Sequence, residues 1–143
     1  MATNDVDALV IFGATGDLAK IETFPALVGL VQRGVLNVPV IGVAKSGWGL
    51  QQFRDYAVAS LRLNNMDPDS EAARKMLGLL RYVDGDLDAD STYQEMSEAI
   101  GAGTRVLFYL EVPPPLFGRI AQGIATAGRS ARTAAAAPLG HHA

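Results

Sequence analysis

A glycine-rich turn near the N-terminus is the first feature of the sequence that could do chemistry. The five apolar residues 8–12 run directly into Gly13, and Gly16 and Ala19 follow at a spacing of three. Between a strand and a helix, the first glycine permits a tight turn, the second lets the backbone approach a phosphate, and the alanine lets the helix pack closely on the sheet. Because the N–H groups and the dipole at a helix start favour an anion, the pattern predicts a nucleotide-binding turn.

The turn also admits a simpler interpretation, as a plain glycine connection between a strand and a helix. It is not a phosphate loop of the Walker type, because Lys20 comes too late and no Ser or Thr follows it. Asp17 is interpreted as an acid in the first helical turn, where the helix dipole favours it by roughly 0.3–1 kcal/mol.

A second candidate site consists of Lys45 and Ser46, at the end of the next apolar run. An NAD-preferring site usually has an acid at this place, which binds the ribose hydroxyls. A cation followed by a hydroxyl suits the 2′-phosphate of NADP, so the sequence favours NADP over NAD. About 20 residues usually separate the glycine turn from this second site. The longer separation here predicts a long crossover between the first two strands. The alternative is that Lys45 is a solvated loop lysine.

An α/β sheet would bring these residues together, and the apolar pattern predicts one. Continuous apolar runs, typical of parallel strands covered on both faces, predict buried strands at 8–12, 38–44 and 105–112, with a short strand at 81–83. Helical patterns alternate with these runs. The alternation predicts an α/β fold with a Rossmann-like doubly wound parallel sheet and right-handed crossovers.

Five helices are expected between and after these strands. The first, which Pro25 kinks or restarts and Gly34 ends, has an apolar face of Leu18, Ile21, Phe24, Val28 and Val31. The second has an apolar stripe of Leu50, Phe53, Ala57 and Leu61. The third is expected to open with Asp67 as its cap and Pro68 in its first turn. Two more helices are expected at 91–100 and at about 115–127.

Composition excludes several classes of protein. The chain has 143 residues, a net charge of −3 and no cysteine, as expected for one globular domain without disulfides, cysteine-ligated zinc or thiol catalysis. We expect no nucleic-acid partner, because Lys and Arg form no stripe. We expect no membrane span, because no apolar run reaches about 18 residues. The polar, acidic N-terminus is not a secretory signal, and a cytoplasmic location is expected. No metal site is assigned.

The composition changes near the C-terminus. Four consecutive alanines and few bulky apolar residues occur after about Ala127, where the α/β rhythm requires another strand. Alanine is a poor strand former, so a weak strand at best is expected and the sheet is expected to be incomplete at its C-terminal end. We therefore divide the chain into an NAD(P)-binding domain at 1–128 and a divergent low-complexity tail at 129–143.

Four motifs resemble, in order and spacing, the N-terminal coenzyme domain of glucose-6-phosphate dehydrogenase, with the actinobacterial type most similar. They are "FGATGDLAK", "IGVAKSGW", "YVDGDLDADSTY" and "LFYLEVPPPLF". The resemblance covers about residues 6–128. It implies an oxidoreductase of the pentose phosphate pathway, which oxidises glucose 6-phosphate to 6-phosphogluconolactone and passes the hydride to NADP.

The resemblance also implies which residues bind the coenzyme. Asp86 and Leu87 match a segment beside the adenine, and Pro113 and Pro114 match a turn near the nicotinamide. Lys45 stands where the family usually has an arginine for the 2′-phosphate. Glu111, where the family often has a small apolar residue, is interpreted as tolerated variation. The implied coenzyme-binding set is Gly13, Thr15, Gly16, Asp17, Leu18, Lys45, Ser46, Asp86, Leu87, Pro113 and Pro114.

The tail departs from the family pattern. The family's next strand ends in a motif of the form V-E-K-P-F-G-[HR]-D, but here Ala136 and Ala137 replace the glutamate and the lysine. The catalytic histidine motif and the large antiparallel-sheet domain have no counterpart, so no catalytic residue is assigned. We expect a truncated chain that is inactive by itself, with glucose 6-phosphate bound only in a full-length relative. Exposed apolar surface near 113–117 is expected to favour self-association.

Other interpretations remain open. One is a non-catalytic NAD(P)-binding module, and another is a truncated gene product without function. A short-chain dehydrogenase needs a Tyr-x-x-x-Lys pair, which none of the four tyrosines supplies: Tyr56, Tyr82, Tyr93 and Tyr109.

Overall fold

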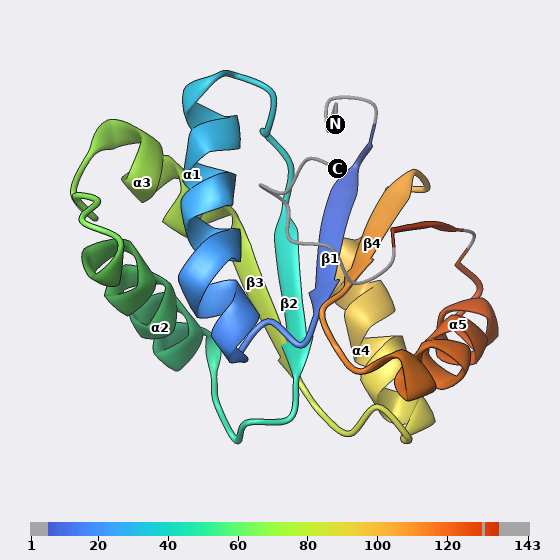
Figure 1. Ribbon diagram of the computed structural model, residues 1–143. Helices are drawn as coiled ribbons and strands as arrows, with labels where there is room; N and C mark the ends of the chain where they lie inside the picture. The colour runs from blue at the N-terminus through green and yellow to red at the C-terminus, as the bar shows by residue number, and fades with distance from the viewer. Residues whose placement is uncertain (1–5, 130, 135–143) are drawn as a thin grey trace.

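Five parallel strands form a single sheet at the centre of the molecule. The computed structural model describes residues 6–129 and 131–134. The strand order is β3-β2-β1-β4-β5, and every neighbouring pair is parallel (Figure 1). The strands are β1 (Ala8–Phe12), β2 (Val40–Ala44), β3 (Leu80–Asp84), β4 (Val106–Leu110) and β5 (Ala131–Ala134). The four predicted strands are confirmed, each within two residues at either end.

Helices cover both faces of the sheet, which confirms the doubly wound α/β fold (Figure 1). Three helices share one apolar core with β1 and β2, and two pack in a second core on the opposite face. The first group comprises α1 (Phe24–Gln32), α2 (Leu50–Leu63) and α3 (Glu71–Leu79), and the second comprises α4 (Asp90–Ile100) and α5 (Phe117–Thr126). No helix in the described part of the chain is long and apolar enough to cross a membrane.

The first helix differs from its predicted apolar face at one position. It opens with a π-helical segment, η1 (Ala19–Thr23), and continues as α1, whose second residue is Pro25; the predicted restart at this proline is therefore confirmed. The wider π turn shifts the helical phase, so that Thr23 is buried while Ile21 is 54% exposed. The prediction that Ile21 faces the core is wrong, because it assumed a regular α-helical period.

The start of α3 also differs from the prediction. Asp67 does not cap the helix: its carboxylate accepts a hydrogen bond from the N–H of Asp69 in the preceding turn, at 2.9 Å. The cap is Ser70, whose hydroxyl accepts from the N–H of Ala73 at 3.2 Å. Two polar residues can both serve as a cap in this sequence, and the turn around Pro68 places Ser70 at the helix end.

The edge of β4 pairs with a short strand of four residues, in agreement with the expectation of a weak strand at this end of the sheet. β5 follows β4 in register from Val106 to Tyr109. Main-chain hydrogen bonds need no bulky side chain, so the alanines of this segment do not prevent pairing. Just before β5, Arg129 donates to the carbonyl oxygens of Ser97, Gly101 and Gly103 at 2.6–2.8 Å, which fixes the chain at the end of α4. The domain boundary at 128 stays a prediction, although the sheet continues beyond it.

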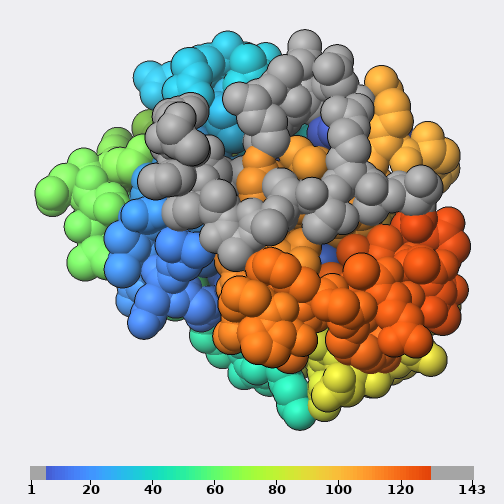
Figure 2. All heavy atoms as spheres, turned by 45° about the vertical axis from the view of Figure 1, so that its right-hand side comes forward, coloured from blue at the N-terminus to red at the C-terminus, as the bar shows by residue number. Residues whose placement is uncertain are grey.

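The turn after β4 exposes apolar side chains, as the sequence predicts. Pro113, Pro114, Pro115 and Leu116 are exposed, with Leu116 at 37%. Figure 2 shows this segment, in orange, on the surface beside α5. In the next helix, α5, the apolar side chains of Ile120 and Ile124 are buried against α4. Self-association through this surface stays a prediction.

Close packing between α4 and α5 fixes the position of the loop that follows β3. A side chain at Gly123 of α5 would overlap the ring of Tyr93 on α4. That ring cannot easily move, because its hydroxyl donates to the carbonyl of Leu87 at 2.7 Å and the guanidinium of Arg119 lies over its face. The contact between the two helices therefore sets the position of Leu87 in the loop after β3.

We predict that Gly123→Ala destabilises the chain by about 1–3 kcal/mol, the usual cost of overpacking a well-filled contact. Gly118→Ala is the matched control in the same helix, where an added Cβ meets nothing within 4 Å. It should be neutral or stabilise by up to about 1 kcal/mol through its helix propensity. Urea unfolding of the 143-residue chain measures both variants. Equal effects of the two substitutions would contradict the packing argument.

Candidate functional site

The loops that follow β1, β2, β3 and β4 meet along the carboxyl edge of the sheet, on the lower side of Figure 1. β1 lies between β2 and β4, and the chain switches faces there, so this edge contains the topological switch point where open α/β sheets bind ligands. All eleven predicted coenzyme-binding residues lie in these four loops and the helix start that follows the first of them: Gly13, Thr15, Gly16, Asp17, Leu18, Lys45, Ser46, Asp86, Leu87, Pro113 and Pro114.

The glycine turn follows β1 directly. Gly13 has φ +82°, and a Cβ there would overlap the carbonyl oxygen of Glu111 at the end of β4. Among the described residues, a Cβ at Gly16 would meet only the carbonyl of Gly13, at 3.4 Å, which leaves room for a ligand beside Gly16 in this part of the chain. Helical structure begins at Asp17, so this residue lies in the first helical turn as predicted, and it is exposed. The first N–H groups of this helix have no acceptor within it, and they fit the oxygens of a pyrophosphate.

Aromatic side chains support the turn from α2. The hydroxyl of Tyr56 donates to the carbonyl of Gly16 at 2.8 Å. The ammonium of Lys20 lies 5.4 Å from the centre of the same ring, and the ring of Trp48 lies 5.2 Å from it. Trp48 is the single tryptophan of the sequence, so it reports on this site. These residues are not among those predicted from the sequence for the site, and the aromatic residue in "KSGW" was the available signal.

Hydrogen bonds join the glycine turn to the loop after β2. The hydroxyls of Thr15 and Ser46 lie 2.6 Å apart. Asp84, the last residue of β3, accepts from the N–H groups of Ser46 and Gly47 at 2.8 and 3.0 Å and from the hydroxyl of Tyr82 at 2.6 Å. Burial alone would raise the pKa of Asp84, but these bonds hold it below its usual value. Asp84 therefore fixes the loop that presents the predicted 2′-phosphate residues.

Lys45 forms an ion pair with Asp86, at 3.2 Å, with its side chain 72% exposed. The N–H of Asp88 donates to the Asp86 carboxylate, and this bond together with Lys45 lowers the pKa of Asp86. An exposed pair of this kind contributes little to stability, so Lys45 can exchange Asp86 for another anion at little cost. The exposed ammonium of Lys45 is therefore available to bind a phosphate group of a ligand.

Glu111 directly follows β4 beside the glycine turn, and its carboxyl is buried. The hydroxyl of Thr23 donates to Oε2 at 2.6 Å, while Oε1 is buried without a hydrogen-bond partner among the described residues. Burial raises the pKa of Glu111 to about 7, the Thr23 hydrogen bond opposes this rise, and the charge of Glu22 adds to it. The interpretation of Glu111 as tolerated variation stays a prediction. A charged residue inside the apolar run "RVLFYLEV" was the signal for this buried carboxyl.

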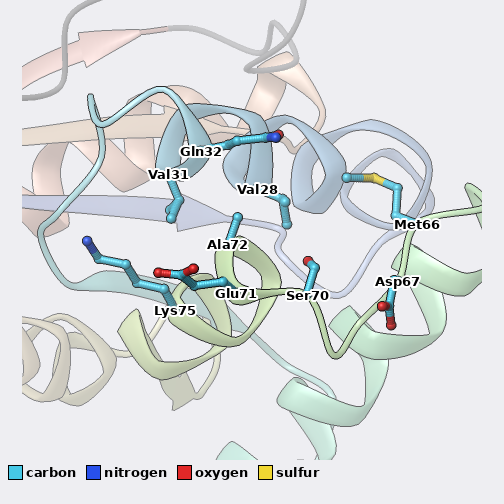
Figure 3. A pocket seen from close by; sticks show the side chains of 9 residues that line it. All are labelled: Val28, Val31, Gln32, Met66, Asp67, Ser70, Glu71, Ala72 and Lys75. Atoms are coloured by element: carbon cyan, nitrogen blue, oxygen red, sulfur yellow. The ribbon is translucent and has the colours of Figure 1, made fainter.

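A separate cavity of about 580 Å³ lies between α1 and α3 (Figure 3). Among the described residues it is lined by Val28, Val31, Gln32, Met66, Asp67, Ser70, Glu71, Ala72 and Lys75. None of the predicted coenzyme residues is in that set, so we assign the site to the loops of the carboxyl edge rather than to this cavity. Within the described part of the chain, no group of three or more His, Cys, Asp or Glu side chains could hold a metal ion.

Comparison with known proteins agrees with the geometry. Residues 10–142 match the family described as "Glucose-6-phosphate dehydrogenase, NAD binding domain". The chain is 38% identical over 137 residues to "Glucose-6-phosphate 1-dehydrogenase 1" of Mycobacterium tuberculosis, a match that covers 94% of this chain and 29% of that protein.

Solved structures give the same assignment. The glucose-6-phosphate 1-dehydrogenase of Mycobacterium avium superposes with a TM-score of 0.84 at 40% identity, over 91% of this chain and 29% of that one. A glucose-6-phosphate dehydrogenase in complex with its substrate glucose-6-phosphate gives a TM-score of 0.77 at 30% identity, over 94% of this chain and 31% of that one. The chain thus spans less than a third of its relatives' length. It belongs to the NAD-binding domain family of glucose-6-phosphate dehydrogenase.

Proposed function

We propose that this chain binds NADP at the carboxyl edge of its sheet, as the coenzyme-binding part of a glucose-6-phosphate dehydrogenase. The observation that carries the proposal is the convergence of two anion-compatible groups. The helix start after Gly13 and Gly16 offers free N–H groups and open space to a pyrophosphate. Lys45, held beside it by the Thr15–Ser46 contact, offers a positive charge to a 2′-phosphate. A cytoplasmic location and the absence of a nucleic-acid partner belong to the same proposal.

The bound coenzyme would supply the hydride acceptor for oxidation of a sugar hydroxyl. The residues of this chain bind and orient it: the glycine turn receives the pyrophosphate, Asp86 and Leu87 lie toward the adenine, and Pro113 and Pro114 border the nicotinamide. Glucose 6-phosphate as the substrate is proposed for the full-length enzyme. The two relatives compared as solved structures carry that activity or that substrate in their descriptions.

If Lys45 binds the 2′-phosphate, the chain should bind NADP more tightly than NAD, and Lys45→Asp should reverse the order. The variant loses an attraction and gains a repulsion, so its NADP affinity should fall at least about tenfold, or about 1.4 kcal/mol. Its NAD affinity should change by less than about threefold. Calorimetric titration measures both constants, and Trp48 fluorescence gives an independent reading.

Lys75→Asp is the matched control, since Lys75 is an exposed lysine on α3 that lines the separate cavity. It makes the same charge change and should leave the preference for NADP intact. Equal affinities of the parent chain for the two coenzymes would contradict the assignment of Lys45. A loss of the preference for NADP in both variants would show that the net charge of the chain, and not a contact of Lys45 with the 2′-phosphate, decides the preference.

We further expect no NADPH to form when the 143-residue chain is mixed with glucose 6-phosphate and NADP. Hydride transfer needs a positioned hydroxyl and a base that removes its proton. At the described carboxyl edge Glu111 titrates near neutrality, but its carboxyl oxygens are turned into the protein, where Oε1 is buried and Oε2 is bonded to Thr23. Absorbance of NADPH measures turnover. Activity that copurifies with the chain would contradict the expectation.

A further inference from the structure

Glu111 contacts both ends of the segment that contains the glycine turn and the helix start of the candidate coenzyme site. Its backbone N–H donates to the carbonyl of Phe12 at 2.9 Å, and its own carbonyl lies against Gly13. Its side chain reaches instead to Thr23, the last residue of the π-helical segment that follows the glycine turn. The backbone of Glu111 therefore contacts the start of the segment proposed to bind the pyrophosphate, and its side chain contacts the end of that segment.

The carboxyl group lacks the partners that a buried carboxylate needs. Thr23 is 1% exposed and donates a hydrogen bond to Oε2, and Oε1 has no partner among the described residues. The titratable groups that interact with this carboxyl are Glu22, which is exposed on the same helix, and Tyr109 on β4. Neither carries a positive charge that would stabilise the ionised form.

Ionised Glu111 would also oppose the coenzyme. The helix begins at Asp17 and rises about 1.5 Å per residue, so Thr23 lies about 9 Å along the axis from its first residue. A negative charge held at Thr23 therefore lies near the two negative charges of a pyrophosphate at that helix start. In the protonated form the group keeps its contact with Thr23 and exerts no repulsion.

We propose that Glu111 is a positioning residue whose carboxyl must be protonated for tight coenzyme binding, so that binding of the dinucleotide takes up a proton. The inference rests on the proposed function, since it concerns the same site. It adds that affinity falls as the pH rises through the titration of Glu111. The expected loss is about three- to tenfold, as for one additional charge at this separation in a partly solvated site.

The experiment is a titration of the 143-residue chain with NAD at about pH 6 and about pH 8.5, on either side of the Glu111 pKa of about 7. NAD is the first probe because the 2′-phosphate of NADP itself titrates near about pH 6. The parent chain should bind NAD about three- to tenfold more weakly at the higher pH. Glu111→Gln retains an amide that can bond to Thr23 and should bind equally at both values.

Two further variants make the result specific. Glu95→Gln, the same substitution at an exposed glutamate on α4, should keep the pH dependence of the parent chain. Thr23→Val removes the hydrogen bond that lowers the pKa of Glu111, so it should move the midpoint of the pH profile upward. Calorimetry of the parent chain near pH 7 in buffers of different ionisation enthalpy should detect proton uptake, which requires no variant to fold.

The outcomes separate the two proposals. Binding with the same pH profile in the parent chain and in Glu111→Gln, or without proton uptake by the parent chain, would overturn the inference and leave the proposed coenzyme function intact. Absence of NAD and NADP binding at every pH would overturn the proposed function and this inference with it. A pH dependence that Glu111→Gln abolishes would establish both.

Without coenzyme, the free energy of unfolding of the chain should also depend on the protonation of Glu111. The pKa of Glu111 is about 7 in the folded state and near 4.5 in the unfolded chain, so the folded state binds the proton more tightly. The stabilisation is complete below about pH 4.5 and is lost as the pH rises through about 7. The midpoint of urea unfolding should therefore fall over this range relative to Glu111→Gln. Parallel curves for the two chains would contradict a buried, titrating carboxyl.

Discussion

The close approach of Gly13 to the backbone of β4 is the constraint on which the rest of the structure depends. The N–H of Gly13 donates to the carbonyl of Val43 in β2, and the carbonyl of Phe12 accepts from the N–H of Glu111, each at 2.9 Å. β1 is thus fixed to both neighbours at the point where the turn leaves the sheet. A side chain at residue 13 would separate β1 from β4 and move the helix start away from Lys45.

β1, β2 and β4 are continuous apolar runs, and for this reason the sequence predicted much of the fold. The glycine turn and Lys45 were assigned to the site from their residue types, and the loops after β3 and β4 were added to it by the family resemblance. Ile21 and Ser70 could not be predicted in the same way. The π turn changes which residue faces the core, and the turn before α3 changes which residue caps the helix. Neither turn leaves a sign in the pattern of apolar residues along the sequence.

Contacts between elements account for the site residues that the sequence did not reveal. Tyr56 and Asp84 bind backbone groups of loops about 40 residues away, at Gly16 and Ser46. Their own neighbours in sequence carry no sign of these partners. Glu111 is different, because a charged residue within an apolar strand conflicts visibly with the rest of that strand. Such local conflicts tend to occur at functional sites, and here the conflict lies beside the glycine turn.

The acids of this edge differ in how their charge is compensated. Asp84 is bonded to backbone N–H groups and to Tyr82, and Asp86 is paired with Lys45 in solvent. Both can stay ionised beside an anionic ligand, because donors or a cation already face them. Glu111 has one hydroxyl donor and a buried, unpartnered oxygen. A proton is the remaining way to neutralise the carboxylate of Glu111, and the need for that proton follows from its burial beside the turn that we propose to bind a pyrophosphate.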